Sequence, residues 1–245
     1  MSRLFAANLM RLKKSKLFWF LVVVAAVLSL TLVILLILYP DSIDKIMFAY
    51  PVLIAFMIPA LIGIFFGTEY SEGTLRNKLM IGHSRRNIYL ANLLTTLLAA
   101  YALLVSYLIP VLLLGFPVLG VPSMGWGAVI KILLVSMITI GATCSMHVMI
   151  SMTISNKTSA TVVNLALAFL SYELTSILFS LSTSLTGIGA AVCQIIINIL
   201  PMGQSVQYMM GEVSISLWLL ALYAVTVMTI FTVIGMVIFR QKNIK

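Results

Sequence analysis

Hydrophobic residues run in long stretches along the chain, and short polar segments separate them. A helix that crosses a bilayer needs roughly 20 mostly apolar residues. Six stretches have about that length, and they cover residues 17–39, 47–66, 90–114, 132–154, 158–181 and 215–239. The pattern therefore predicts an all-α membrane protein with six transmembrane helices, built as a single transmembrane domain over residues 1–245.

A further apolar stretch covers residues 188–200, but it is short for a crossing and Pro201 closes it. A seventh crossing here would also place the basic C-terminal tail on the side opposite to the other basic segments. We therefore expect residues 182–212 to form a re-entrant or interfacial segment on the outer side. Such a segment must be buried in protein or line a cavity, because lipid cannot satisfy an irregular backbone.

The first 16 residues have a different pattern, in which apolar and basic side chains take opposite sides of a helical wheel. The apolar arc holds Leu4, Phe5, Leu9 and Leu12, and the opposite arc holds Arg3, Arg11 and Lys14. This pattern is typical of an amphipathic helix that lies in the membrane interface. An ordinary basic tail in front of the first span explains the same residues equally well.

Composition and charge agree with a membrane protein and orient it. The chain is 62% hydrophobic and 9% charged, whereas soluble domains carry about a quarter charged residues. With the N-terminus inside, the inner segments hold thirteen Lys and Arg residues and the outer segments hold only Lys45 and Lys131. Basic residues concentrate in cytoplasmic loops, so we expect a multi-pass plasma- or inner-membrane protein with both termini cytoplasmic. The net charge of +9 then needs no nucleic-acid partner.

The sequence offers little support for an enzyme. It contains no G-x-x-x-x-G-K-[ST] motif that would cradle nucleotide phosphates. Its histidines, His83 and His147, are far apart and have no neighbouring Cys or carboxylate that would complete a metal site. We therefore predict no catalytic residue, no metal site and no cofactor bound by this chain.

The longest polar segment covers residues 68–87, between the second and third apolar stretches, and changes from acidic to basic along its length. Ser71 is a suitable N-cap, and Glu72 would follow in the first turn of a helix. Leu75 and Leu79 then lie four residues apart on one face, and Gly82 ends the helix. The segment predicts either a short helix that docks to a soluble partner or a solvated connector.

This segment reads acidic-x-x-Glu-Gly-Thr-Leu-Arg from Glu69 to Arg76, and Ser-Arg-Arg follows at residues 84–86. The pattern resembles the permease subunits of ABC-2-type ATP-binding-cassette exporters, in particular small peptide exporters of the lantibiotic or phenol-soluble-modulin type. The length, the six spans, the amphipathic elbow helix and the re-entrant segment agree with that resemblance. The motif covers about 20 residues, and the architecture covers the whole chain.

The resemblance implies that residues 68–87 contain a coupling helix that seats in a cleft of a separate ATPase subunit. Two copies of that ATPase would hold ATP and Mg, and a second permease, identical or different, would complete the transporter. Glu69 and Glu72 would then pair with basic groups of the elbow or the ATPase. The complete set of implied coupling residues is Glu69, Glu72, Gly73, Thr74, Leu75, Arg76, Leu79, Arg85 and Arg86.

Polar residues inside the predicted spans supply the remaining candidates. Glu173 is the one full charge within a predicted span, and an intramembrane carboxylate is a candidate functional group. It belongs either to a transport pathway, together with Phe169 and Tyr172, or to a structural contact with the re-entrant segment. His147 and Asn164 lie at similar depth in adjacent spans, which favours an interhelical hydrogen bond.

These observations lead to one functional expectation and two alternatives. We expect a permease subunit that moves an amphipathic or hydrophobic substrate outward, in particular a peptide, using the ATP hydrolysis of a partner. A secondary transporter or channel is the first alternative, although that class usually has repeated broken helices or several intramembrane ionisable groups. The second alternative is an immunity or sensor protein that binds a peptide without transporting it.

Overall fold

The computed structural model describes residues 1–39 and 43–242. Residues 40–42, in the predicted first outer loop, and residues 243–245, which hold one of the thirteen inner basic residues, lie outside this part. Within it, every regular element is a helix.

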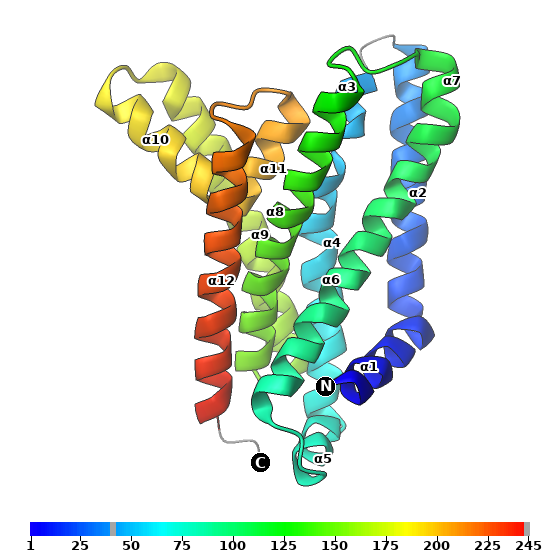
Figure 1. The fold of residues 1–245 in the computed structure, drawn as a ribbon, viewed down its shortest axis with the longest axis vertical. Coiled ribbons are helices and arrows are strands. Elements are labelled where there is room, and N and C mark those ends of the chain that lie inside the picture. Colours follow the sequence, from blue (N-terminus) through cyan, green and yellow to red (C-terminus); the bar gives the residue numbers. More distant parts are fainter. Residues whose placement is uncertain (40–42, 243–245) are drawn as a thin grey trace.

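Six of these helices are long and apolar enough to cross a membrane, as the hydrophobic pattern predicts. They are α2 (Lys16–Leu38), α4 (Tyr50–Ser71), α6 (Arg85–Pro110), α8 (Trp126–Thr153), α9 (Lys157–Ser184) and α12 (Leu217–Gln241). They run alternately up and down the long axis of the molecule (Figure 1). Helix α6 continues through a π-helical turn, Val111–Gly115, into the short helix α7 (Phe116–Leu119), so the third span is longer than expected.

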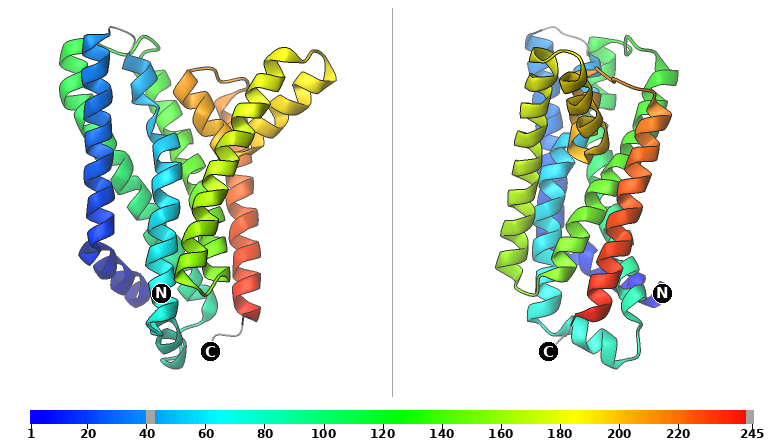
Figure 2. Two further views of the ribbon diagram at one scale, coloured as in Figure 1. Left: turned by 180° about the vertical axis from the view of Figure 1, so that it is seen from behind. Right: turned by 90° about the vertical axis from the view of Figure 1, so that its left-hand side faces the viewer.

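Helix α4 lies at the centre of the bundle, and its neighbours surround it. It packs against α6, α8 and α9, while α12 packs along α8 and α2 packs along α6. The apolar window of α4 is 72% buried, whereas the windows of α2, α9 and α12 are each 22% buried. The views in Figures 1 and 2 place α2 at one side of the bundle and α9, α10 and α12 at the other. These peripheral helices therefore leave wide apolar faces for lipid or for another subunit.

Two glycines allow α4 and α9 to approach closely. A Cβ atom added to Gly63 would lie 2.5 Å from the Cα of Thr161, and one added to Gly67 would lie 2.6 Å from the Cα of Lys157. The two glycines are four residues apart and form a G-x-x-x-G pattern, which brings membrane helices into backbone contact. The backbone of α9 therefore occupies the space that larger side chains on α4 would need.

The N-terminal residues form α1 (Ser2–Lys14), which meets α2 at an angle (Figure 1). Ser15 separates the two helices, and its hydroxyl accepts a hydrogen bond from the Phe18 backbone N–H at 3.3 Å. Leu4 and Leu12 are buried, and α1 packs against α6. The amphipathic elbow helix is thus present, although Asn8 is also buried on its apolar side.

The segment after α9 turns back at Gly187 and forms α10 (Ile188–Ile199) and α11 (Pro201–Met210), which are bent by 99° relative to each other. Gly203 permits this bend, because a Cβ there would lie 2.2 Å from the carbonyl oxygen of Ile197. The pair starts and finishes at one end of the bundle, which we call the α10 end (Figure 1). This is the re-entrant shape expected from the short apolar stretch.

Two short helices complete the described part of the chain. Helix α3 (Ile43–Met47) precedes α4, and α5 (Thr74–Met80) connects α4 to α6. Helices α1 and α5 and the last turn of α12 gather opposite to α10 and α11 (Figure 1). We call this the α5 end of the bundle.

Candidate functional site

A buried carboxylate lies at the α5 end, where α4 finishes. Glu69 is in the last turn of α4, and its side chain is fully buried. Arg11 of α1 forms an ion pair with its Oε1 atom, and the Nζ of Lys78 in α5 lies 2.6 Å from the same oxygen. The expected pairing of Glu69 with the elbow helix is therefore present, and a second cation comes from the loop helix itself.

Two asparagines extend this arrangement to α6. Lys78 donates a hydrogen bond to the side-chain oxygen of Asn8 at 2.9 Å, and the Asn8 amide donates to the side-chain oxygen of Asn92 at 2.6 Å. The Asn92 amide in turn lies 3.5 Å from Oε2 of Glu69. We call Asn8, Arg11, Glu69, Lys78 and Asn92 the Glu69 cluster, which joins α1, α4, α5 and α6.

The charged groups of the cluster are paired with one another and are largely shielded from solvent. The Arg11 guanidinium also lies 4.6 Å from the centre of the Phe65 ring, and its side chain is 30% exposed, against 14% for Lys78. A buried charge is tolerated only when it is paired and hydrogen-bonded. Each member of the cluster therefore depends on the others, and displacement of one helix disturbs the remaining three.

The cluster also explains why the boundary between α4 and α5 differs from the expected one. Ser71 and Glu72 do not begin the loop helix, because α4 continues through Ser71 and Glu72 follows as its C-cap. Buried pairing of Glu69 stabilises this last turn of α4 in a stretch that looks like a polar loop. Gly73 then adopts a left-handed conformation, φ 65°, and becomes the N-cap residue of α5. The Thr74 hydroxyl donates a hydrogen bond to the Glu69 carbonyl at 3.2 Å and fixes the junction.

The exposed surface of α5 differs from the expected leucine ridge. Leu75 is only 1% exposed and packs into the core, and Leu79 is half-buried against it. Met80 and Ile81 are 68% and 77% exposed, just before Gly82, which has a φ of 92° and ends the segment. The apolar surface available to a partner is therefore Met80 and Ile81. Arg76, one helical turn before Met80, is exposed and gives this surface a charged margin, whereas Glu72 is exposed at the other end of α5.

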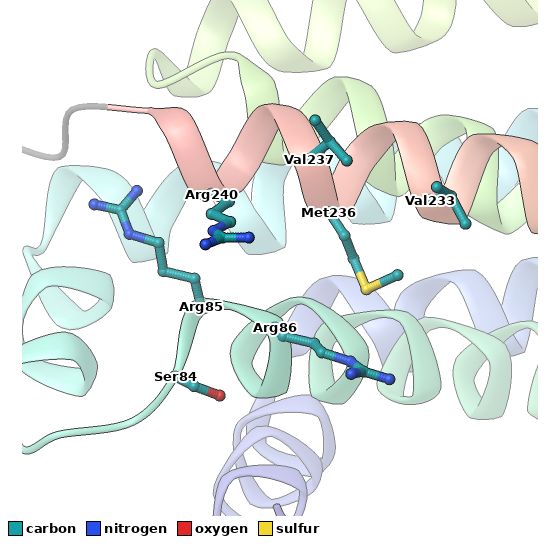
Figure 3. A pocket seen from close by; sticks show the side chains of 7 residues that line it. All are labelled: Ser84, Arg85, Arg86, Val233, Met236, Val237 and Arg240. Atoms are coloured by element: carbon teal, nitrogen blue, oxygen red, sulfur yellow. The ribbon is translucent and has the colours of Figure 1, made fainter.

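Arg85 and Arg86 begin α6 and have separate environments. The Arg85 guanidinium donates hydrogen bonds to the carbonyl oxygens of Phe239, at 2.9 Å, and Lys242, so it ties α6 to the end of α12. Arg86 is exposed and faces a groove between the two helices (Figure 3).

Lys242, just after the end of α12, contacts α8 and α4. Its ammonium group donates to the Met152 carbonyl at 3.1 Å and lies 3.9 Å from the centre of the Tyr70 ring. Burial lowers the pKa of Lys242 to about 8. The ends of α4, α6, α8 and α12 are thus joined beside the Glu69 cluster.

The expected hydrogen bond between His147 and Asn164 is present. Nδ1 of His147 lies 2.9 Å from the side-chain oxygen of Asn164, and both residues are buried. The Asn164 amide also donates to the Ser151 hydroxyl at 2.7 Å. These bonds hold α8 and α9 together within the bundle, so they indicate a structural role.

The candidate pathway residues lie on the outer face of α9. Glu173 is exposed, and Phe169 and Tyr172 are 58% and 36% exposed. The rings of Phe169 and Tyr172 lie 5.1 and 5.7 Å from the ring of Phe56 in α4, measured between centres. Among the described residues, Glu173 forms no hydrogen bond with α10 or α11, so the structure gives no support to a structural contact there.

A second polar network lies near the α10 end, and the sequence reasoning did not identify it. Thr139 of α8 donates to the side-chain oxygen of Gln204 at 2.7 Å and lies 3.2 Å from the Tyr208 hydroxyl. The Gln207 amide donates to the side-chain oxygen of Asn198 at 2.9 Å. The polar residues of 201–210 were the available signal, since a re-entrant segment must bury its polar groups in protein.

Comparison with known proteins identifies the family. A family model described as "ABC-2 family transporter protein" matches residues 4–172, which is more than half of the chain. The matched part contains most of α1, the Glu69 cluster, α5 and the His147–Asn164 pair, and it stops just before Glu173. A comparison with curated proteins finds no match. The family match and the six spans together show that this chain belongs to the ABC-2 transporter family, as the membrane-spanning permease component that associates with an ATP-binding-cassette ATPase.

Proposed function

We propose that this chain is the permease of an exporter in which a separate ATPase moves α5 and so drives an amphipathic peptide outward. The observation that carries the proposal is the Glu69 cluster. It connects the short helix α5 to α1, α4 and α6 through buried ion pairs and hydrogen bonds. A force applied to α5 therefore reaches three other helices without passing through a flexible loop.

The docking surface would be the exposed end of α5. Met80 and Ile81 are apolar and solvent-exposed, and the exposed Arg76 lies one helical turn before Met80. Apolar side chains in a charged margin are typical of the centre and rim of a protein interface. In this proposal a cleft of the ATPase subunit encloses Met80 and Ile81, and ATP and Mg are bound only by that subunit.

The orientation follows from the basic residues. The α5 end holds Arg76, Lys78, Arg85, Arg86 and Arg240 as well as the basic residues of α1. Because basic segments stay in the cytoplasm, we place the α5 end inside, where an ATPase can reach it, and the α10 end outside.

A second permease would cover the outer face of α9. This face carries several large exposed apolar residues, namely Val162, Val163, Phe169, Leu170, Leu174 and Ile177. Glu173 lies among them, and a carboxylate that faced hydrocarbon would be costly to keep charged. A second copy, together with a second ATPase, would form a pathway between the two α9 helices and give Glu173 a polar environment.

The same face supports a proposal for the substrate class. Glu173 would attract a basic group, while Phe169 and Tyr172 would contact apolar side chains. A cationic amphipathic peptide, such as those moved by lantibiotic or phenol-soluble-modulin exporters, combines these two properties. The open apolar face suits such a ligand better than a small inorganic ion.

Co-purification with the ATPase tests the docking surface. Met80→Asp with Ile81→Asp places two charges in the proposed interface, and an unpaired charge there costs several kcal/mol. We expect at least a tenfold loss of ATPase captured by the tagged permease from native membranes, with normal expression. The control, Leu185→Asp with Ile188→Asp, changes two exposed apolar residues at the α10 end and leaves capture unchanged. Normal capture by the α5 variant would show that α5 is only a connector.

A further inference from the structure

A groove opens between α6 and α12 at the α5 end. It has a volume of about 510 Å³ and is lined by Ser84, Arg85, Arg86, Val233, Met236, Val237 and Arg240 (Figure 3). It lies on the periphery of the bundle and does not include the Glu69 cluster or α5. Three of its seven lining residues are arginines and none is acidic.

Two of these arginines are available to a ligand. Arg85 is occupied, because it donates to the carbonyl oxygens of Phe239 and Lys242, and Figure 3 shows it turned away from Arg86. Arg86 and Arg240 are exposed, and within residues 1–39 and 43–242 neither forms a side-chain hydrogen bond or ion pair. Two guanidinium groups, one from each helix, therefore face a groove in which none of the described lining residues carries a carboxylate.

The other lining residues on α12 are apolar, and their order along the helix indicates how a ligand would lie. Residues 233, 236, 237 and 240 share one face of the helix by their spacing. Val233, Met236 and Val237 come first, and Arg240 follows in the last turn, where the apolar span ends. Val233 and Val237 are 48% and 51% exposed. The groove therefore changes from apolar to cationic in the direction from the membrane interior to its surface.

We propose that this groove binds an anionic phospholipid of the leaflet at the α5 end. The phosphate lies between Arg86 and Arg240, and an acyl chain follows Val237, Met236 and Val233 into the membrane. Basic pockets between transmembrane helices are known to suit such headgroups, and the planar guanidinium group matches phosphate in geometry. A net negative lipid is favoured over a zwitterionic one because the lining residues that the structure describes supply positive charge and no negative charge. This inference does not depend on the transport proposal.

Native mass spectrometry of the purified full-length chain tests the headgroup site. The protein is titrated with phosphatidylglycerol and, separately, with phosphatidylcholine of the same acyl chains. We expect Arg86→Gln with Arg240→Gln to weaken phosphatidylglycerol binding about tenfold and to leave phosphatidylcholine binding unchanged. The matched control, Arg3→Gln with Lys13→Gln, removes the same charge from exposed positions of α1 and keeps the affinity. An equal loss in both variants would show that only overall charge attracts the lipid and would overturn the site.

The apolar half of the groove has its own test. Val237→Trp fills it at a surface position and should weaken phosphatidylglycerol binding without changing the arginines. Val225→Trp is the control, because Val225 is a similarly exposed valine of α12, at 46%, outside the groove. Inorganic phosphate at millimolar concentration should not displace the lipid. Displacement by phosphate would show that the groove binds a soluble anion and not a phospholipid. Full lipid affinity in Val237→Trp would show that no acyl chain lies along Val237 and would overturn the proposed lipid site.

Discussion

At the scale of single residues, Glu69 is the centre of the buried ion pairs at the α5 end. Its carboxylate is fully buried and contacts cations from α1 and α5, which are 58 and 9 residues away in the sequence. Buried ion pairs of this kind are weak evidence for stability, but removal of one partner is costly because it leaves the others unpaired. Glu69 therefore fixes the relative positions of helices that have few other polar contacts.

Replacing this carboxylate should destabilise the protein. Glu69→Gln leaves Arg11 and Lys78 without their shared anion, and we expect the free energy of unfolding to fall by about 3 kcal/mol. Thermal unfolding of the purified protein, followed by fluorescence, measures the change. Glu72→Gln is the matched control, because Glu72 is an exposed carboxylate three residues later and forms no ion pair among the described residues. Equal unfolding temperatures for the two variants would contradict the structural role of the cluster.

The sequence identifies Glu69 as a functional candidate, but it does not predict that this side chain is buried. Polar residues after position 66 resemble a loop, and a helix is expected to end where the apolar stretch ends. Here α4 continues to Ser71 because Arg11 and Lys78 neutralise Glu69 inside the protein. Both cations come from other helices, so no local pattern reveals the pairing. The role of Asn8 could not be predicted for the same reason, since its hydrogen-bond partners lie in α5 and α6.

At the scale of helices, the hydrophobic pattern predicts well where the membrane-spanning helices lie, but it predicts poorly which faces of the helices contact one another. Six stretches of roughly 20 apolar residues give six spans because lipid requires a helix at each of them. The pattern does not identify which face of α5 is exposed. Four-residue spacing places Leu75 and Leu79 together, but the bundle buries this face and leaves Met80 and Ile81 outside. A short helix that lies beside a larger hydrophobic core packs its apolar face against that core, so this face is not available to a partner protein.

The contact between α4 and α9 gives a prediction at this scale. Gly67→Ala adds a Cβ 2.6 Å from the Cα of Lys157, which neither backbone can avoid without a shift. We expect a loss of about 1–3 kcal/mol, as for other overpacked sites, measured by thermal unfolding. Gly127→Ala is the control, because Gly127 is also helical but its Cβ would meet no atom within 4 Å. If Gly67→Ala were as stable as Gly127→Ala, the close approach of α4 and α9 would be wrong.

At the scale of the whole molecule, the chain has a strongly connected α5 end and an uncovered face along one side. The Glu69 cluster, Arg85 and Lys242 join the ends of α1, α4, α5, α6, α8 and α12 through ion pairs and hydrogen bonds. The outer face of α9, with Glu173, lies at the side of the bundle and requires a second subunit in our proposal. Family membership supplies the ATPase partner, and in our proposal the Glu69 cluster carries the motion of that partner to the membrane helices.

Peptide uptake into inside-out proteoliposomes tests this account most directly. Permease co-purified with its ATPase is reconstituted, and accumulation of a fluorescent cationic amphipathic peptide is followed with ATP outside. We predict accumulation that requires hydrolysable ATP, is abolished by Met80→Asp with Ile81→Asp, and is reduced by Glu173→Gln at normal protein levels. Accumulation driven by an ion gradient without ATP, or an active ATPase complex that moves no peptide, would contradict the proposal of an ATP-driven peptide exporter.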